Sequence, residues 1–206
     1  MKYTAKILAI MGSVNHKGSE MLKKILTIII LFVASLSTGF AGSFYLGPAL
    51  TYADIRSSDL TYQALMPGIY GGYGAWRNEW LYLGLEAFAT SKSILTEDSD
   101  NDNTILRVSH SYGISVVPMV NLDEVIFGLL RVGYLRTKFP KLDTIQGGYQ
   151  LGIGLEGILV GCWNLRGEVD YVKYGSIKNE DSDVHVGSVH AVEYTLALIY
   201  RFDSLL

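Results

Sequence analysis

The feature that most constrains this chain is an alternation of residue types that begins near Ser43 and continues almost to its end. In residues 163–175, WNLRGEVDYVKYG, charged side chains occupy every second position, and residues such as Leu165 and Tyr171 lie between them. A period of two places the two sets on opposite faces of a β-strand. This segment is therefore predicted to be a strand with one ionic face and one apolar face.

Seven other segments show the same period, with Leu, Val, Ile or Tyr on one face and Gly, Ser, Thr or charged residues on the other. They are residues 43–53, 62–76, 80–90, 104–120, 125–137, 148–159 and 189–202. Short connections follow the second, fourth and sixth strands. Longer polar connections follow the others, at Asp54–Leu60, Lys92–Asn103, Lys138–Gln146 and Ser176–Ser188. This regular exchange of tight turns and long loops is typical of an up-and-down meander.

The polarity of the strands predicts a membrane environment. An outer surface with apolar residues on every strand would aggregate in water. A bilayer solvates such a surface, provided that every backbone group is paired within a closed sheet. We therefore predict an all-β fold, an eight-stranded antiparallel up-and-down transmembrane β-barrel with small and charged residues facing its lumen.

The charged residues that alternate with apolar ones are predicted to form a network inside this barrel. An eight-stranded barrel has an interior just wide enough for side chains to fill, so opposite charges there would hydrogen-bond and plug the tube. The predicted lumen residues are Glu86, Arg107, Arg131, Glu156, Arg166, Glu168, Asp170, Glu193 and Arg201. Catalytic use of the carboxylates is the competing interpretation, but no nucleophile or metal-ligand spacing accompanies them.

Aromatic residues gather toward the strand ends, where those that face outward would suit the belts at the two membrane–water boundaries. They include Tyr45, Tyr52, Tyr112, Tyr134, Tyr171, Tyr200 and Phe202.

The N-terminal segment has the layout of a secretory signal. Lys23 and Lys24 precede an apolar run from Ile25 to Leu36, and small residues follow. That run is too short to span a bilayer as a helix, which needs ~20 residues; an uncleaved anchor is the alternative interpretation. We expect a cleavable signal peptide within an N-terminal extension (1–41) and a barrel domain (42–206). Translation could begin at Met1 or at Met21.

Composition argues against several functional classes. The chain has 17 basic and 20 acidic residues, and its first 41 positions contain five of the basic and one of the acidic residues. The rest of the chain therefore carries a net charge of −7. The absence of a basic stripe in the sequence argues against a nucleic-acid partner. The single cysteine, Cys162, and four scattered histidines predict neither a disulfide nor a zinc site, and no cofactor is expected. The acidic runs 97–102 and 179–183 are a weak calcium signal, since neither has the EF-hand pattern; solvated loops are the favoured interpretation.

The chain resembles the small outer-membrane β-barrels of the opacity and OmpA-like type. The resemblance covers roughly residues 43–202 and rests on GIYGGYGAW, YLGLEAFA, GYQLGIGLEG, LRGEVDYVKYG and the closing ALIYRF. It implies a surface-exposed monomeric barrel in the outer membrane of a Gram-negative bacterium. Such families end in an aromatic residue that the barrel-assembly machinery reads; Phe202 matches that position, although four residues follow it.

Three functions remain open from the sequence. The favoured one is a non-enzymatic surface protein, an adhesin, an antigen or an envelope component, that meets host surface molecules through its long loops. The second is a small pore. The third is a lipid-A-modifying barrel enzyme, suggested only by His110, Ser111 and His190. In all three cases outer-membrane lipid and the assembly machinery are the expected partners.

Overall fold

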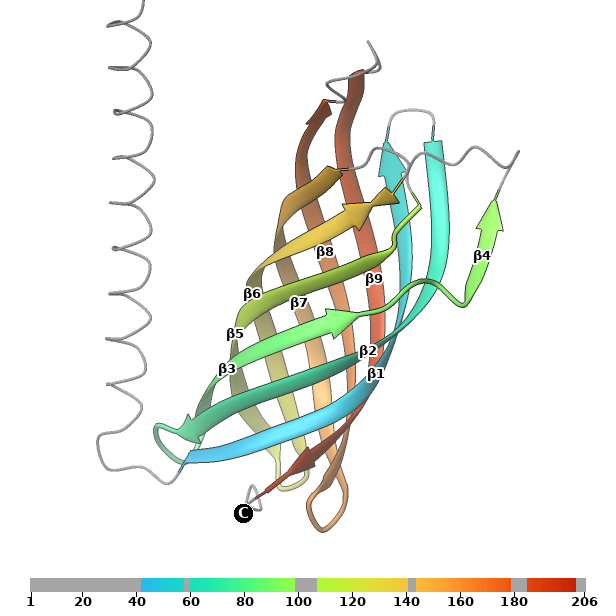
Figure 1. Ribbon diagram of the computed structural model, residues 1–206. Coiled ribbons are helices and arrows are strands. Elements are labelled where there is room, and N and C mark those ends of the chain that lie inside the picture. Colours follow the sequence, from blue (N-terminus) through green and yellow to red (C-terminus); the bar gives the residue numbers. More distant parts are fainter. Residues whose placement is uncertain (1–41, 58–59, 99–106, 141–143, 179–184, 203–206) are drawn as a thin grey trace, which may run out of the picture. The chain divides into compact units, whose positions relative to one another are not determined.

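A computed structural model describes residues 42–57, 60–98, 107–140, 144–178 and 185–202 (Figure 1). Its strands are β1 (Gly42–Ser57), β2 (Leu60–Trp76), β3 (Leu81–Thr90), β4 (Leu95–Asp98), β5 (His110–Asp123), β6 (Ile126–Phe139), β7 (Thr144–Val160), β8 (Trp163–Lys178) and β9 (His185–Arg201). The described residues contain no helix of the length and hydropathy needed to cross a membrane.

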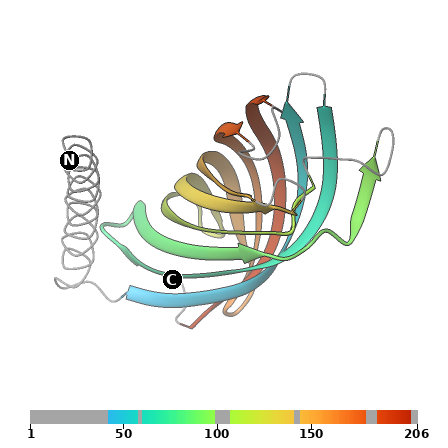
Figure 2. The same ribbon diagram turned by 45° about the horizontal axis from the view of Figure 1, so that its top comes forward.

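Eight of these strands close into an antiparallel barrel. Strands that follow one another in the chain pair from β1 through β2, β3, β5, β6, β7 and β8 to β9, and β9 also pairs with β1, which closes the ring. The short strand β4 pairs only with the upper part of β2, from Leu65 to Tyr62, and stands off the barrel wall (Figure 2). The predicted eight-stranded barrel is thus confirmed, with β4 as an addition within the loop predicted at Lys92–Asn103.

The barrel has two different ends. Both Gly42 and Phe202 lie at one end, called here the short-turn end, together with the turns at 77–80, 124–125 and 161–162. Gly161 in the last of these turns has φ of 55°, a left-handed conformation that glycine adopts without a steric penalty. The other end, the loop end, carries the remaining connections.

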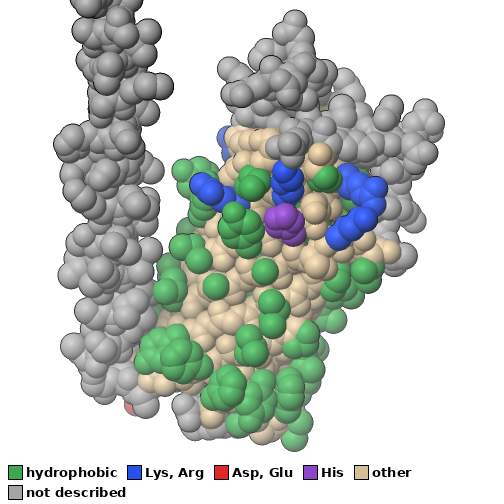
Figure 3. Space-filling model, in the orientation of Figure 1, with side chains coloured by type: hydrophobic (Ala, Val, Ile, Leu, Met, Phe, Trp, Pro, Cys, Tyr) green, Lys and Arg blue, Asp and Glu red, His purple; other side chains and the backbone are tan. Residues whose placement is uncertain are grey.

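The alternation of burial along each strand follows the sequence pattern. Along β1, side chains alternate between buried and exposed over almost the whole strand. The exposed set is apolar: Leu151 is 56% exposed, Ile153 66% and Leu196 56%. These side chains cover much of the outer wall (Figure 3), a surface that requires a hydrocarbon solvent.

Two aromatic belts border this apolar wall. Toward the loop end the exposed tyrosines are Tyr52, Tyr112, Tyr134, Tyr149, Tyr171 and Tyr194. Neighbouring rings contact one another, with centroids 6.3 Å apart for Tyr52 and Tyr194 and 5.6 Å for Tyr134 and Tyr149. At the short-turn end lie Phe44, Trp163, Tyr200 and Phe202. The belts are about 26 Å apart along an inclined strand such as β8. At the ~40° tilt of barrel strands this is about 20 Å along the barrel axis, comparable with the ~25 Å apolar band of outer-membrane barrels.

The strands continue past the outer tyrosine belt, which corrects the predicted loops. The segment predicted as a loop at Asp54–Leu60 is mostly strand, because β1 continues to Ser57 and pairs there with Leu60 of β2. The connections predicted at Lys138–Gln146 and Ser176–Ser188 are shortened in the same way by β6, β7, β8 and β9, whereas the one predicted at Lys92–Asn103 is longer because β5 begins only at His110. The physical reason is an apolar interior at this end, including Ile55 and Tyr62, which favours continued strand pairing.

Candidate functional site

Charged side chains occupy the middle of the lumen. Eight of the nine residues predicted for the network are at most 8% exposed: Glu86, Arg131, Glu156, Arg166, Glu168, Asp170, Glu193 and Arg201. They come from β3, β6, β7, β8 and β9, and each occupies the inward phase of its strand. We call this set the lumen charge cluster.

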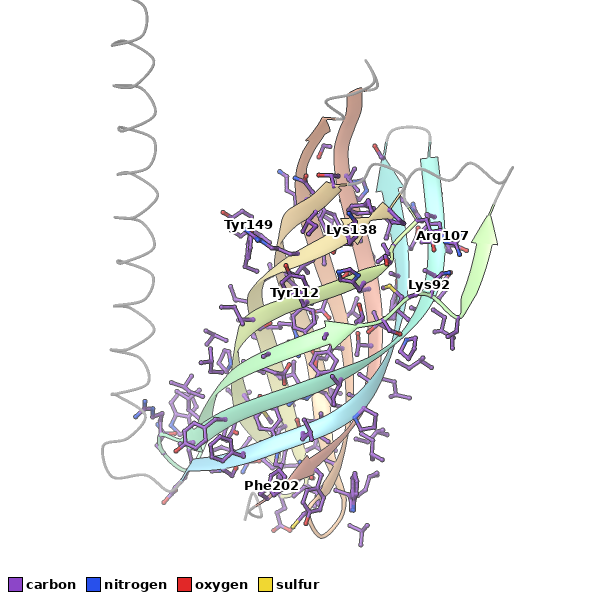
Figure 4. The ribbon with its side chains drawn as sticks, viewed as in Figure 1. Lys92, Arg107, Tyr112, Lys138, Tyr149 and Phe202 are labelled. Carbon is purple, nitrogen blue, oxygen red and sulfur yellow. The ribbon has the colours of Figure 1, made fainter. Side chains whose placement is uncertain are left out.

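Arg107 is the exception and corrects the predicted set. It lies before β5, which begins only at His110, and its side chain is exposed at the loop end (Figure 4). The sequence pattern predicted a lumen position because Arg107 alternates with the same set of positions as Ser109 and Ser111. Alternate residues share a face only within a β-strand, and Arg107 precedes the strand. The arginines of the cluster are therefore three rather than four.

Arg166 of β8 is the hub of the lumen charge cluster. Its Nε donates to Oε2 of Glu156 at 2.8 Å, and Nη1 donates to Oε2 of Glu86 at 2.6 Å. A longer bond of 3.4 Å joins Nη1 to Oε1 of Glu168. One buried guanidinium thus neutralises charge from three strands, and its five N–H groups in a planar fork suit that role.

Arg131 of β6 makes a bidentate contact. Its Nε and Nη2 donate to the two carboxylate oxygens of Glu168 at 2.6 and 3.0 Å, and Nη1 donates to Ser115 at 3.1 Å. Its Nη2 also forms an ion pair with Glu86, 2.5 Å from Oε1. Glu86 thus joins the Arg131 and Arg166 halves of the cluster.

Arg201 of β9 completes the cluster near the short-turn end. Its Nε and Nη2 both donate to Oε1 of Glu156, at 2.9 and 2.7 Å. The same oxygen accepts a 2.6 Å bond from Asn164. Glu156 therefore accepts hydrogen bonds from two arginines and one amide. A buried carboxylate needs such partners because the surrounding interior has low polarity.

Aromatic rings separate the arginines, and the pattern did not assign these rings to the cluster. Tyr45 lies beneath both Arg166 and Arg201, at 5.5 and 4.8 Å from guanidinium carbon to ring centroid. Arg201 also lies 5.0 Å from the ring of Tyr82 and donates to its hydroxyl at 3.0 Å. Contacts of this kind are favourable for a desolvated cation. Alternation is the sequence signal that could have placed these rings in the lumen. Tyr45, for example, lies on the same strand face as the small residues Gly47 and Ala49.

Apolar side chains fill the lumen on both sides of the charges. Toward the short-turn end the buried cluster consists of Tyr82, Val117, Met119, Phe127 and Leu129, with Trp76 and Ile158 against it. Toward the loop end the buried residues include Ile55, Tyr62, Met66, Leu135, Phe139, Val172, Tyr174 and Val189. The expectation of a lumen filled by small and charged residues therefore holds only for its middle.

Two carboxylates of the cluster lack a close cation. Asp170 and Glu193 are direct cross-strand partners on β8 and β9. The nearest arginine contact of Asp170 is 3.7 Å, from Arg131, and neither of its oxygens accepts a hydrogen bond. Like charges directly opposite one another destabilise a sheet, so this is the least compensated part of the cluster.

The residues considered for catalysis are not brought together. His110 is exposed, whereas Ser111 is buried and bonded to Thr137 at 2.8 Å. His190 is on β9 and stacks on Tyr171. Among the residues that the structure describes, no three His, Cys, Asp or Glu side chains form a metal-binding group. Residues 99–102 and 179–183 of the acidic runs lie outside the described ranges.

Comparisons with known proteins agree with this geometry. A family model described as outer membrane protein beta-barrel domain matches residues 25–202. Among solved structures, the chain is similar to Neisserial surface protein A at 17% identity, covering 79% of this chain and 99% of that one, with a TM-score of 0.50. It is also similar to Ail, the attachment invasion locus protein of Yersinia pestis, at 16% identity, 78% and 97% coverage and a TM-score of 0.46. These likenesses concern the fold alone. No curated protein matches the chain.

Proposed function

The chain belongs to the outer membrane protein β-barrel domain family, and from that premise we propose that it is a bacterial surface protein that neither conducts ions nor catalyses a reaction. The barrel anchors it in the outer membrane as a monomer. The loop end presents the protein to the surroundings, where host surface molecules are the expected partners. The barrel-assembly machinery inserts it and reads Phe202, which is exposed at the short-turn end (Figure 4).

One observation supports this proposal: buried side chains line the lumen at both ends and in the middle of the part of the barrel that the structure describes. Three arginines and their carboxylates occupy the middle, and apolar clusters occupy both flanks. An ion crossing this barrel would have to displace buried side chains that are hydrogen-bonded to one another. An anchor needs no open path, whereas a pore does, so the packing favours the surface protein over the pore that the sequence left open.

Planar-bilayer recording tests the closed lumen. We expect the refolded barrel to insert without producing a steady unitary current, because the Arg166–Glu86 and Arg201–Tyr82 contacts join opposite sides of the tube. Folding is verified independently by heat-modifiable migration, and insertion by flotation of the protein with lipid vesicles from the same preparation. A reproducible unitary conductance from the folded, inserted barrel would refute the non-conducting anchor in favour of the pore.

Labelling of cysteine tests the orientation, and the chain supplies its own control. Lys92 is exposed at the loop end, while Cys162 lies in the β7–β8 turn at the short-turn end. In a Cys162→Ser background, Lys92→Cys should react with a membrane-impermeant maleimide on intact cells, because outer-membrane barrels turn their short connections toward the periplasm. The native Cys162 should react only after the outer membrane is permeabilised. The reverse pattern would mean that the proposed orientation is wrong.

A further inference from the structure

The lumen charge cluster contains more anions than cations. Among the buried residues that the structure describes, three arginines lie with five carboxylates, so the ionised cluster has a net charge of −2. Glu86, Glu156 and Glu168 each form an ion pair with an arginine. The excess negative charge therefore falls on Asp170 and Glu193. A buried charge is costly unless a partner compensates it.

The nearest arginine is already engaged by another carboxylate. Nε of Arg131 lies 3.7 Å from Oδ1 of Asp170, but its single hydrogen is donated to Oε2 of Glu168 at 2.6 Å. Neither oxygen of Asp170 accepts a hydrogen bond. Glu193 forms no ion pair with a cation in the described ranges. The protein's own arginines thus leave this pair of carboxylates uncompensated.

A third oxygen-bearing side chain lies beside the two carboxylates. Asp170 and Glu193 are directly opposite on β8 and β9, where Cβ atoms are about 5 Å apart. Asp170 extends over the adjoining strand β7, because a Cβ on Gly152 would overlap its Oδ1. Gln150 is the next inward residue of β7. Its amide oxygen and nitrogen have no hydrogen-bond partner, although the residue is only 2% exposed.

Small residues surround these groups, and apolar residues cover them. Gly152 of β7 and Ala53 of β1 are the cross-strand neighbours of the two carboxylates. Toward the loop end the next inward pair on β8 and β9 is Val172 and Ala191, which are fully buried. An ion bound between the carboxylates would therefore be shielded from bulk water, and would enter while the barrel folds.

We propose that Asp170, Glu193 and Gln150 bind one calcium ion inside the lumen. Carboxylate and amide oxygens are the ligands that calcium prefers, and its divalent charge equals the excess negative charge of the cluster. Magnesium suits the site less well, because it needs near-octahedral geometry and gives up its water reluctantly. The inference is independent of the surface function proposed above. It adds an ion that would link β7, β8 and β9.

Metal content after refolding tests this proposal. The barrel is refolded in neutral detergent without lipid, in the presence of excess calcium, excess magnesium or a chelator. It is then desalted and analysed by inductively coupled plasma mass spectrometry. We expect the parent to retain about one calcium ion per barrel and much less magnesium. Its urea midpoint should be higher after refolding in calcium than in chelator, because a ligand that binds only the folded state stabilises it.

Two variants remove one ligand each. Glu193→Gln and Gln150→Leu should both retain at least about tenfold less calcium than the parent, since ligand number and charge set the affinity. In chelator both should be at least as stable as the parent. The first removes an excess buried charge, and the second replaces an amide without a partner by an apolar side chain of similar size. Stability in chelator therefore separates loss of the site from misfolding.

The matched control is Glu124→Gln, which removes an exposed carboxylate in the turn between β5 and β6 and should retain as much calcium as the parent. Equal retention by the parent and all three variants would place the ion elsewhere, for example at the acidic runs 97–102 and 179–183, and overturns the proposal. A parent that retains no calcium, or that prefers magnesium, also overturns it. None of these outcomes bears on the closed lumen or on the orientation of the barrel.

Discussion

Replacing Arg166 by leucine is expected to lower the free energy of unfolding by about 3–5 kcal/mol. The guanidinium hydrogen-bonds Glu86, Glu156 and Glu168 in the closed lumen. Leucine removes the cation while three carboxylates stay buried, and an uncompensated buried charge costs more than the pair itself contributes. Urea unfolding of the refolded barrel in neutral detergent, followed by the gel shift and by tryptophan fluorescence, measures the loss.

The matched contrast is Glu193→Gln, which changes charge in the same cluster with the opposite expected sign. Glu193 faces Asp170 directly across the β8–β9 pair, and the amide could donate a hydrogen bond to a carboxylate that now receives none. The variant should be as stable as the parent or more stable by up to ~1 kcal/mol. If both variants lost stability equally, lumen packing rather than charge compensation would control the cluster.

Alanine at Gly47 is expected to lower stability by about 3 kcal/mol, at the upper end for overpacking. A Cβ at this position would overlap the backbone carbonyl of Leu198 on β9, and would also lie 2.9 Å from the Cα of Ile199. Backbone atoms cannot move aside by changing rotamer, so β1 and β9 would have to separate at the seam that closes the barrel. The yield of heat-modifiable folded protein and the urea midpoint both report this loss.

Gly167→Ala supplies the control for this prediction because it is the same substitution in another strand. Gly167 of β8 faces outward, and a Cβ there meets no atom within 4 Å. This variant should fold normally, with a gain of up to ~1 kcal/mol from the reduced freedom of the unfolded chain. Equal effects at both positions would contradict a special role for Gly47 at the seam.

Most of the wall of the barrel was predictable from the sequence, and part of its interior was not. The outward face of β7, with Tyr149, Leu151 and Ile153, was assigned from period two alone and is exposed as expected. Arg107 was misplaced because a pattern shows the phase of a residue but not where the strand begins. The loop-end extension was missed because turn-forming residues such as Asp54, Ser57 and Ser58 obscured a strand that is stabilised by interior contacts.

The sequence by itself determined which side chains face lipid and which face the tube, because alternation is a local property of each strand. It also determined the number of strands in the barrel, since apolar runs and turn residues are local signals. Only the tertiary structure decided which cation meets which anion. Arg166 and Glu86 are 80 residues apart in the chain, and closure of the β1–β9 seam sets the register that brings them together. The apolar interior beyond the tyrosine belt also depends on the tertiary structure, because each strand can extend there only when the neighbouring strands pair with it.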